Sequence, residues 1–127
     1  AATITAHDDA VLCLAFSPDG QRLASGAQDR APLKIWKVGT WEAASTLYGH
    51  RSSVRAIVSL PNGDLVTGSN DHTIRIWGTA PAEWEASRTS WISSLALSPD
   101  GKRLASGDLG GSVRLWTLKE MMEPRAE

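Results

Sequence analysis

Residues 67–77, TGSNDHTIRIW, bring together side-chain types that hydrolases use. Thr67 offers a hydroxyl, Asp71 a carboxylate and His72 an imidazole, and His50 supplies a second imidazole upstream. A hydroxyl becomes a nucleophile when an imidazole takes its proton and a carboxylate orients that imidazole. The residue types therefore permit ester or amide hydrolysis by Thr67, His50 and Asp71. Whether these side chains can act in that way depends on the elements that position them.

The chain repeats itself three times with a period of about 40 residues. Stretches that end in Trp recur as LKIW, TIRIW and SVRLW, and a Ser-Gly or Thr-Gly pair lies ten or eleven residues before each Trp. A Pro-Asp-Gly or Pro-Asn-Gly turn precedes each of those pairs. The landmarks keep the same order and nearly the same spacing in every cycle. The polar residues of 67–77 therefore belong to a repeating unit.

Each cycle predicts strands rather than helices. The runs VLCLAF (11–16), VRAIVSL (54–60) and ISSLALS (92–98) are apolar, lack helical spacing and are too short for helices. Each ends at a turn in which Pro presets the backbone and Gly tolerates left-handed geometry. A second strand and a Trp-bearing third strand follow. Since the more polar segments 43–50 and 83–90 are typical of exposed edge strands, one cycle contains four antiparallel strands.

Units of this length with four strands each pack radially as the blades of a β-propeller. The chain resembles the WD-repeat family of β-propellers over residues 5–118. The resemblance rests on Gly49 and His50, the SPDG turns, the Ser-Gly or Thr-Gly pairs and the Trp that closes each third strand. The Trp-Asp dipeptide of the family is absent, because Lys37, Gly78 and Thr117 follow the three Trp residues. We expect an all-β fold of three WD-type blades that form an incomplete arc.

The phase of the repeats predicts where each blade begins. We expect three repeats at about 1–42, 43–83 and 84–120, followed by a tail at 121–127. The first segment of each repeat is the outer strand of the preceding blade, so residues 2–6, ATITA, are expected to form such a strand. A closed propeller needs roughly four to eight blades. Three blades leave an apolar sheet face bare at each end of the arc.

For the polar residues, the resemblance implies a structural tetrad of His, hydroxyl, Asp and Trp in each blade. Such a relay pairs polar groups that are costly to bury alone. The set recurs once per cycle and is incomplete in the third, where Arg88 and Gly110 take the His and Asp positions, which favours a structural role over catalysis. We expect His72 to be an exposed turn residue. The tetrad residues are His7, Ser25, Asp29 and Trp36, then His50, Thr67, Asp71 and Trp77, then Ser106 and Trp116.

The resemblance also implies a protein-binding top face, built from residues beside the start of each first strand and just before each tetrad Asp. Trp91 and Arg55 are the residue types most enriched at binding hot spots. The alternative for Trp91 is packing against a neighbouring blade. Carried over by position, the top-face residues are Ala10, Leu12, Gln28, Ser53, Arg55, Asn70, Trp91 and Ser93.

Composition narrows the function classes. Thirteen Lys and Arg against 14 Asp and Glu give a formal net charge of −1, which disfavours nucleic acid and anionic membranes as partners. We expect no cofactor and no metal ion, because the sequence has no phosphate-binding glycine loop and no ligand cluster at metal-like spacing. The single Cys13 fits a reducing compartment. We expect an intracellular, cytoplasmic protein, with the nucleus as the alternative.

These observations predict a non-catalytic WD-repeat scaffold for protein or peptide partners, as part of a larger propeller or complex. Two alternatives stay open. Two copies could close head to tail into a homo-oligomeric propeller by exchanging a strand, with further blades then coming from the same or another chain. The third and least favoured function is a hydrolase that uses Thr67, His50 and Asp71.

Overall fold

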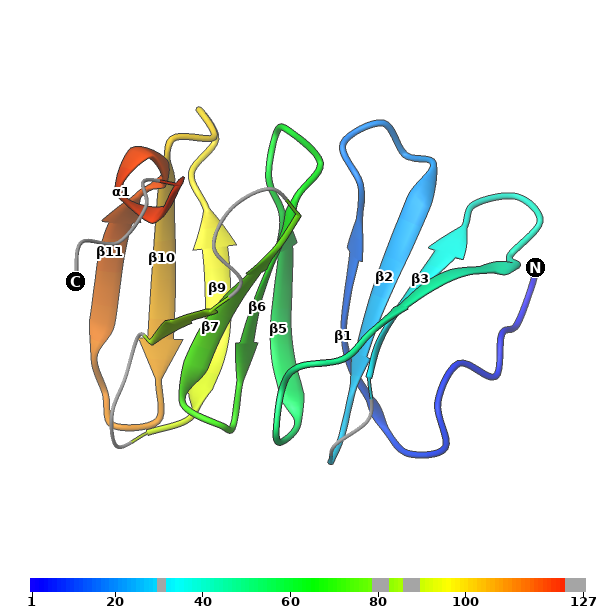
Figure 1. The fold of residues 1–127 in the computed structure, drawn as a ribbon, viewed down its shortest axis with the longest axis horizontal. Coiled ribbons are helices and arrows are strands. Elements are labelled where there is room, and N and C mark those ends of the chain that lie inside the picture. Colours follow the sequence, from blue (N-terminus) through cyan, green and yellow to red (C-terminus); the bar gives the residue numbers. More distant parts are fainter. Residues whose placement is uncertain (30–31, 79–82, 86–89, 123–127) are drawn as a thin grey trace.

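The computed structural model describes residues 1–29, 32–78, 83–85 and 90–122, which form three antiparallel sheets in a row (Figure 1). We call the sheets blades 1, 2 and 3. Blade 1 contains β1 (Val11–Phe16), β2 (Arg22–Ala27), β3 (Leu33–Lys37) and β4 (Ala43–Leu47). Blade 2 contains β5 (Val54–Ser59), β6 (Leu65–Ser69), β7 (Thr73–Trp77) and β8 (Glu83–Glu85). Blade 3 contains β9 (Ile92–Leu97), β10 (Arg103–Asp108) and β11 (Val113–Thr117), and α1 (Leu118–Met122) follows it.

The strands pair in chain order within each blade, as the repeat pattern predicts. In blades 1 and 2 the polar segments that were expected to be edge strands form β4 and β8, which are hydrogen-bonded to the third strands β3 and β7. The registers also define equivalent positions. Ala15 pairs with Ala24 in blade 1, Val58 with Val66 in blade 2, and Ala96 with Ala105 in blade 3. The expected all-β fold of WD-type blades in an incomplete arc is confirmed, with four strands in blades 1 and 2 and three in the described part of blade 3.

The turn after each first strand has the geometry that Pro and Gly predict. The N–H of Gly20 donates to the carbonyl of Ser17 at 2.9 Å, and the same bond recurs at Gly63 and Gly101. Each of these glycines has a positive φ, between 72° and 92°, which other residues adopt only with strain. We call the surface formed by these turns the bottom face, and it lies at the upper edge of Figure 1.

The core lies between the blades rather than within one. One buried cluster joins blade 1 to blade 2 and contains Ala24, Leu33, Val54, Ile57 and Leu65. A second joins blade 2 to blade 3 and contains Leu60, Val66, Ile74, Ile76, Ile92, Leu104 and Met121. Both clusters thus form where one blade covers another.

At both ends of the arc, apolar side chains are exposed. Val11, Leu14 and Phe16 of β1 lie on one end, and Val113 and Leu115 of β11 lie on the other. The positions in blade 2 that are equivalent to Val113 and Leu115 are Ile74 and Ile76, and both are buried against blade 3. The two bare faces expected of an incomplete arc are therefore present.

The structure differs from two expectations near the chain ends. Residues 2–6 form no strand, since a strand needs a hydrogen-bonded neighbour and no described strand pairs with this segment. Leu118–Met122 form α1, and Met121, expected at the start of the tail at 121–127, is buried in the core between blades 2 and 3. In the ranges that the structure describes, no helix is long and apolar enough to cross a membrane.

Candidate functional site

In blade 2 a chain of hydrogen bonds joins the four predicted side chains. The Trp77 indole N–H donates to Thr67 Oγ1 at 2.9 Å, and Thr67 Oγ1 lies 2.6 Å from His50 Nε2. His50 Nδ1 lies 2.9 Å from Asp71 Oδ2. A neutral imidazole that donates from Nδ1 accepts at Nε2, so the Thr67 hydroxyl donates to it. The relay connects β6, β7, the loop before β5 and the turn between β6 and β7.

The Asp71 carboxylate is held by further donors. The backbone N–H of Arg51 donates to Oδ2 at 2.9 Å, and Oδ1 accepts both the Thr73 hydroxyl and the Thr73 N–H. Burial disfavours the charged form, but the hydrogen bonds from His50, Thr73 and Arg51 outweigh it and hold the pKa of Asp71 well below its usual 3.8. Asp71 is therefore a buried and ionised carboxylate.

This relay has the connectivity of a catalytic triad but is closed to substrate. The side chain of Thr67 is 0% exposed, and its oxygen already accepts a hydrogen bond from the Trp77 indole N–H. The side chains of His50 and Asp71 are 3% and 4% exposed. A nucleophile must come within bonding distance of a substrate carbonyl beside an open oxyanion hole. As placed here, the hydroxyl can pair polar groups but cannot meet a substrate.

Blade 1 contains part of the same relay. Trp36 donates to Ser25 Oγ at 3.0 Å, and Ser25 Oγ lies 2.8 Å from His7 Nε2. Burial, followed by the nearby Lys34 charge, lowers the pKa of His7 below its usual 6.5. Among the described residues no hydrogen bond joins Asp29 to His7, and Asp29 is exposed. The expectation that Asp29 completes this relay is therefore not met.

The missing link has a physical cause in the sequence. In blade 2 the Ser69 hydroxyl accepts the Asp71 N–H at 3.1 Å and donates to the Ser53 carbonyl, which fixes the turn. The position equivalent to Ser69 in blade 1 is Ala27, which has no hydroxyl. Instead the Asp29 N–H donates to Ser53 Oγ of blade 2, and Asp29 has a φ of 63°. Asp29 thus links two blades through its backbone.

Blade 3 retains only the link between Trp and hydroxyl. Trp116 Nε1 lies 3.4 Å from Ser106 Oγ, longer than the equivalent bonds in blades 1 and 2. Gly110 stands where Asp is expected and offers no carboxylate. Arg88, predicted at the His position, lies outside the described residues. The relay is complete in blade 2 alone among the parts of the chain that the structure describes.

His72 differs from its expected exposure. It lies in the turn between β6 and β7 with a φ of 74°, but its side chain is half-buried rather than exposed. A non-glycine residue tolerates this conformation only where the surroundings enforce it. Here the hydrogen bonds of Asp71 and Thr73 on either side fix the turn.

The loops that lead into β5 and β9 and the turns that follow β6 and β10 lie at the lower edge of Figure 1, and this surface carries the predicted top-face positions. One backbone hydrogen bond recurs there in each blade and joins the residue before the tetrad Asp position to the loop before the first strand. It runs from Gln28 N to Ala10 O, from Asn70 N to Ser53 O, and from Leu109 N to Trp91 O. The three blades therefore present the same pair of loops side by side. Leu109 is 62% exposed here.

Three of these top-face residues contact one another across blades 2 and 3. Arg55 Nε donates to Asn70 Oδ1 at 2.9 Å, and Arg55 Cζ lies 5.0 Å from the centre of the Trp91 ring. This geometry is a cation–π contact. Trp91 remains 40% exposed, so it both contacts the neighbouring blade and faces solvent. Arg55, Asn70 and Trp91 together form an aromatic and cationic patch.

The remaining top-face residues are less uniform. Ala10 and Gln28 are exposed, whereas Leu12 is half-buried. Ser53 is buried and accepts the Asp29 N–H, and Ser93 donates to the Gly107 carbonyl at 3.3 Å. The side chains of Ser53 and Ser93 are therefore used in hydrogen bonds within the fold. In the described ranges, no group of three or more His, Cys, Asp or Glu residues is placed to hold a metal ion.

Sequence reasoning missed Ser69 and Thr73, which fix the turn that carries Asp71. Their signal was present in the spacing, because each lies two residues from Asp71 in TGSNDHT. Side chains of Ser, Thr and Asp bond backbone groups two residues away in turns of this kind.

Three sheets in a row, each with its first strand beside that of the next blade, define an incomplete β-propeller arc. The chain belongs to the WD-repeat family, because the WD domain, G-beta repeat, matches residues 1–31, 41–78 and 80–117. Repeats of this family generally act as non-enzymatic scaffolds.

The chain is similar to parts of much longer proteins. It is 34% identical over 113 residues to the Periodic tryptophan protein 2 homolog of Neurospora crassa, which is 85% of this chain and 12% of that protein. It is 29% identical to Protein tipD of Dictyostelium discoideum over 91% of this chain and 19% of the relative. The Nuclear distribution protein nudF of Emericella nidulans is 28% identical over 98% of this chain and 39% of the relative. The chain thus spans well under half the length of these relatives.

Proposed function

We propose that this chain is a non-catalytic scaffold that binds a protein or peptide partner on its top face. The observation that carries the proposal is the patch formed by Arg55, Asn70 and Trp91. Trp and Arg dominate binding energy at interfaces when they are held rigidly and can be desolvated by a partner. The contact with Trp91 and the bond to Asn70 fix the Arg55 side chain before binding, which reduces the entropy lost on association.

The net charge of the chain and the exposed residues of the top face favour a protein over a polyanion as the partner. The net charge of −1 offers no broad basic surface. Around this patch Ala10 and Gln28 are exposed and small or polar, and Leu109 adds one exposed apolar side chain. Polar and small residues around a central aromatic and Arg anchor are typical of the rim of a protein interface. We place this interaction inside the cell, where disulfide bonding is not required of a protein with one cysteine.

We further propose that the bare end faces pack against additional blades of the same family. Each face has the residue types that bury themselves between blades inside this chain, such as Val113 and Leu115 at positions equivalent to Ile74 and Ile76. Relatives several times longer than this chain support additional blades over self-closure of two copies.

The test of the top-face proposal is an affinity pull-down from a cell extract with the wild type, Trp91→Ala and Arg55→Ala. We expect each variant to lose the captured partner, because truncation of an anchor costs about 2 kcal/mol or more, roughly 30-fold in affinity. The control is Lys102→Ala, which removes an exposed cationic side chain in the bottom-face turn of blade 3, away from the top face and both bare end faces. Equal capture by all four proteins, with unfolding temperatures unchanged, would refute a role for this patch.

A further inference from the structure

The top-face patch of Arg55, Asn70 and Trp91 carries hydrogen-bond donors that the fold does not use. Arg55 donates through Nε to Asn70 Oδ1, and among the described residues no acceptor lies within hydrogen-bond distance of its two terminal guanidinium nitrogens. Because a guanidinium only donates, Asn70 must turn its oxygen towards Arg55, which leaves the Nδ2 group of Asn70 as a second unused donor within the described ranges.

The indole N–H of Trp91 is a third unused donor. The indole N–H groups of the tetrad residues Trp36, Trp77 and Trp116 lie 2.9–3.4 Å from Ser or Thr hydroxyls. Trp91, which is 40% exposed, has no such bond in the part of the chain that the structure describes. The patch therefore combines one positive charge with three kinds of N–H group, and its chemistry calls for a ligand that is negatively charged and rich in acceptors.

An apolar surface adjoins these donors. The backbone N–H of Leu109 donates to the Trp91 carbonyl at 3.1 Å, and the Leu109 side chain is 62% exposed. The carboxylate of the preceding residue, Asp108, accepts the Ser112 N–H at 3.1 Å and so closes its own turn. Trp91 and Leu109 thus offer a ligand apolar contact beside the Arg55 guanidinium.

We propose that the patch binds an Asp or Glu carboxylate of a partner peptide, together with a neighbouring apolar side chain that packs on Trp91 and Leu109. The proposal rests on the top-face function proposed above and adds the chemistry of the partner. The planar guanidinium presents N–H groups in a geometry that matches the two oxygens of a carboxylate. Phosphate groups are typically held by clusters of Arg, whereas the contact with Trp91 brings one guanidinium to this patch.

The test selects binders to the whole chain from a phage library of randomised seven-residue peptides. We expect the enriched peptides to share an Asp or Glu within two positions of an apolar residue. In one such peptide, made synthetically, replacing the acid with its amide is expected to weaken binding at least about tenfold, because a bond between two charged groups is lost. Arg55→Gln is expected to cause a similar loss, and the amide peptide should lose little more on that variant, because both changes remove one contact.

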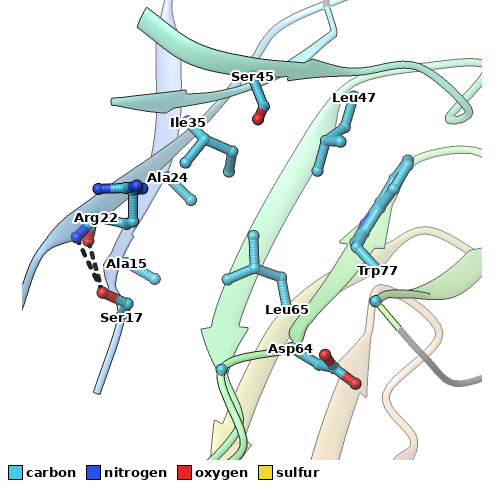
Figure 2. Close-up of a pocket in the computed structure, with 12 residues that line it drawn as sticks. Ala15, Ser17, Arg22, Ala24, Ile35, Ser45, Leu47, Asp64, Leu65 and Trp77 are labelled. Atoms are coloured by element: carbon cyan, nitrogen blue, oxygen red, sulfur yellow. Dashed lines mark hydrogen bonds between the residues drawn. The ribbon is translucent and has the colours of Figure 1, made fainter. Parts of the chain in front are cut away.

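The matched control is Arg103→Gln, the same substitution at an exposed arginine beside the bottom-face turn of blade 3, and it is expected to leave binding unchanged. The indole N–H resonance of Trp91, identified by its absence in Trp91→Phe, is expected to shift on addition of the peptide. An apolar pocket of about 310 Å³ between blades 1 and 2 provides the contrast (Figure 2). A peptide bound there would shift the resonance of Trp77, which lines that pocket, and would not respond to Arg55→Gln.

Four results would overturn the proposal: no enriched peptide, binding that survives Arg55→Gln, a shift at Trp77 without one at Trp91, or tighter binding when phosphoserine replaces the acid. Enriched peptides that lack an acid but still need Trp91 would also overturn it, while leaving the top-face function intact. That function is tested separately, because it fails if the partner captured in the pull-down is retained by Trp91→Ala.

Discussion

Replacing Asp71 with Ala is expected to lower the free energy of unfolding by about 3–5 kcal/mol, the cost of removing one partner from a buried charged network. The carboxylate accepts hydrogen bonds from His50, Arg51 and Thr73, and all of these donors lose their acceptor together. Buried donors without a partner are costly because water cannot reach them. Denaturant-induced unfolding, followed by Trp fluorescence, measures the change.

The matched control is Asp29→Ala, the same substitution at the equivalent position of blade 1. Asp29 is exposed, and within the described ranges its carboxylate has no hydrogen bond to His7, so we expect a change of only about 1 kcal/mol, chiefly because Ala tolerates the positive φ of this position less well than Asp. Similar losses for the two variants would mean that the carboxylate of blade 2 has no special structural role.

The same carboxylate gives a pH signature. Because the folded-state pKa of Asp71 lies below its unfolded value of 3.8, its contribution is fully present above pH 3.8 and is lost as the pH falls towards the folded-state pKa. Between these values the wild type loses up to about 1.4 kcal/mol per pH unit from this group. Asp71→Asn lacks that part of the slope, and identical pH profiles for the two proteins would contradict the assignment.

The second large effect is expected at Ile76. Ile76→Ala is expected to lower the free energy of unfolding by about 2–5 kcal/mol, since the substitution removes buried methyl groups and leaves a cavity. Ile76 is 1% exposed between blades 2 and 3. Chemical denaturation at several protein concentrations measures the loss.

Leu115→Ala is the internal control, because Leu115 occupies the equivalent position of blade 3 and is 74% exposed. A side chain that no blade covers contributes little burial, so we expect a change below about 0.5 kcal/mol. A loss as large as that of Ile76→Ala, and dependent on protein concentration, would mean that a second copy covers this face in solution.

The repeat pattern predicts most of the fold because its landmarks encode local geometry. Pro and Gly fix the turns at Gly20, Gly63 and Gly101, and strand pairing follows from the short distance between successive runs. Residues 2–6 do not form the expected strand, because a strand needs a hydrogen-bonded partner strand. The burial of Met121 depends on packing between blades 2 and 3, which no local pattern in residues 118–122 indicates.

The same contrast between local sequence pattern and tertiary contact applies to the candidate site. The resemblance to the WD-repeat family implied that His50, Thr67, Asp71 and Trp77 lie together, and the recurrence of these residue types in the repeats favoured a structural role. Neither revealed that Asp29 is not bonded to His7, since that depends on Ala27 lacking the hydroxyl that Ser69 supplies in blade 2.

The central claim is that Thr67 holds blade 2 together as the shared centre of a closed relay, and Thr67→Val tests it most directly. Valine keeps the shape of the side chain and removes the oxygen that pairs with both His50 and Trp77. We predict that the free energy of unfolding falls by about 2–4 kcal/mol in Thr67→Val, because two buried groups lose their partner, and that Thr67→Ser, which keeps the hydroxyl, loses distinctly less. A Thr67→Val protein as stable as the wild type would contradict the account.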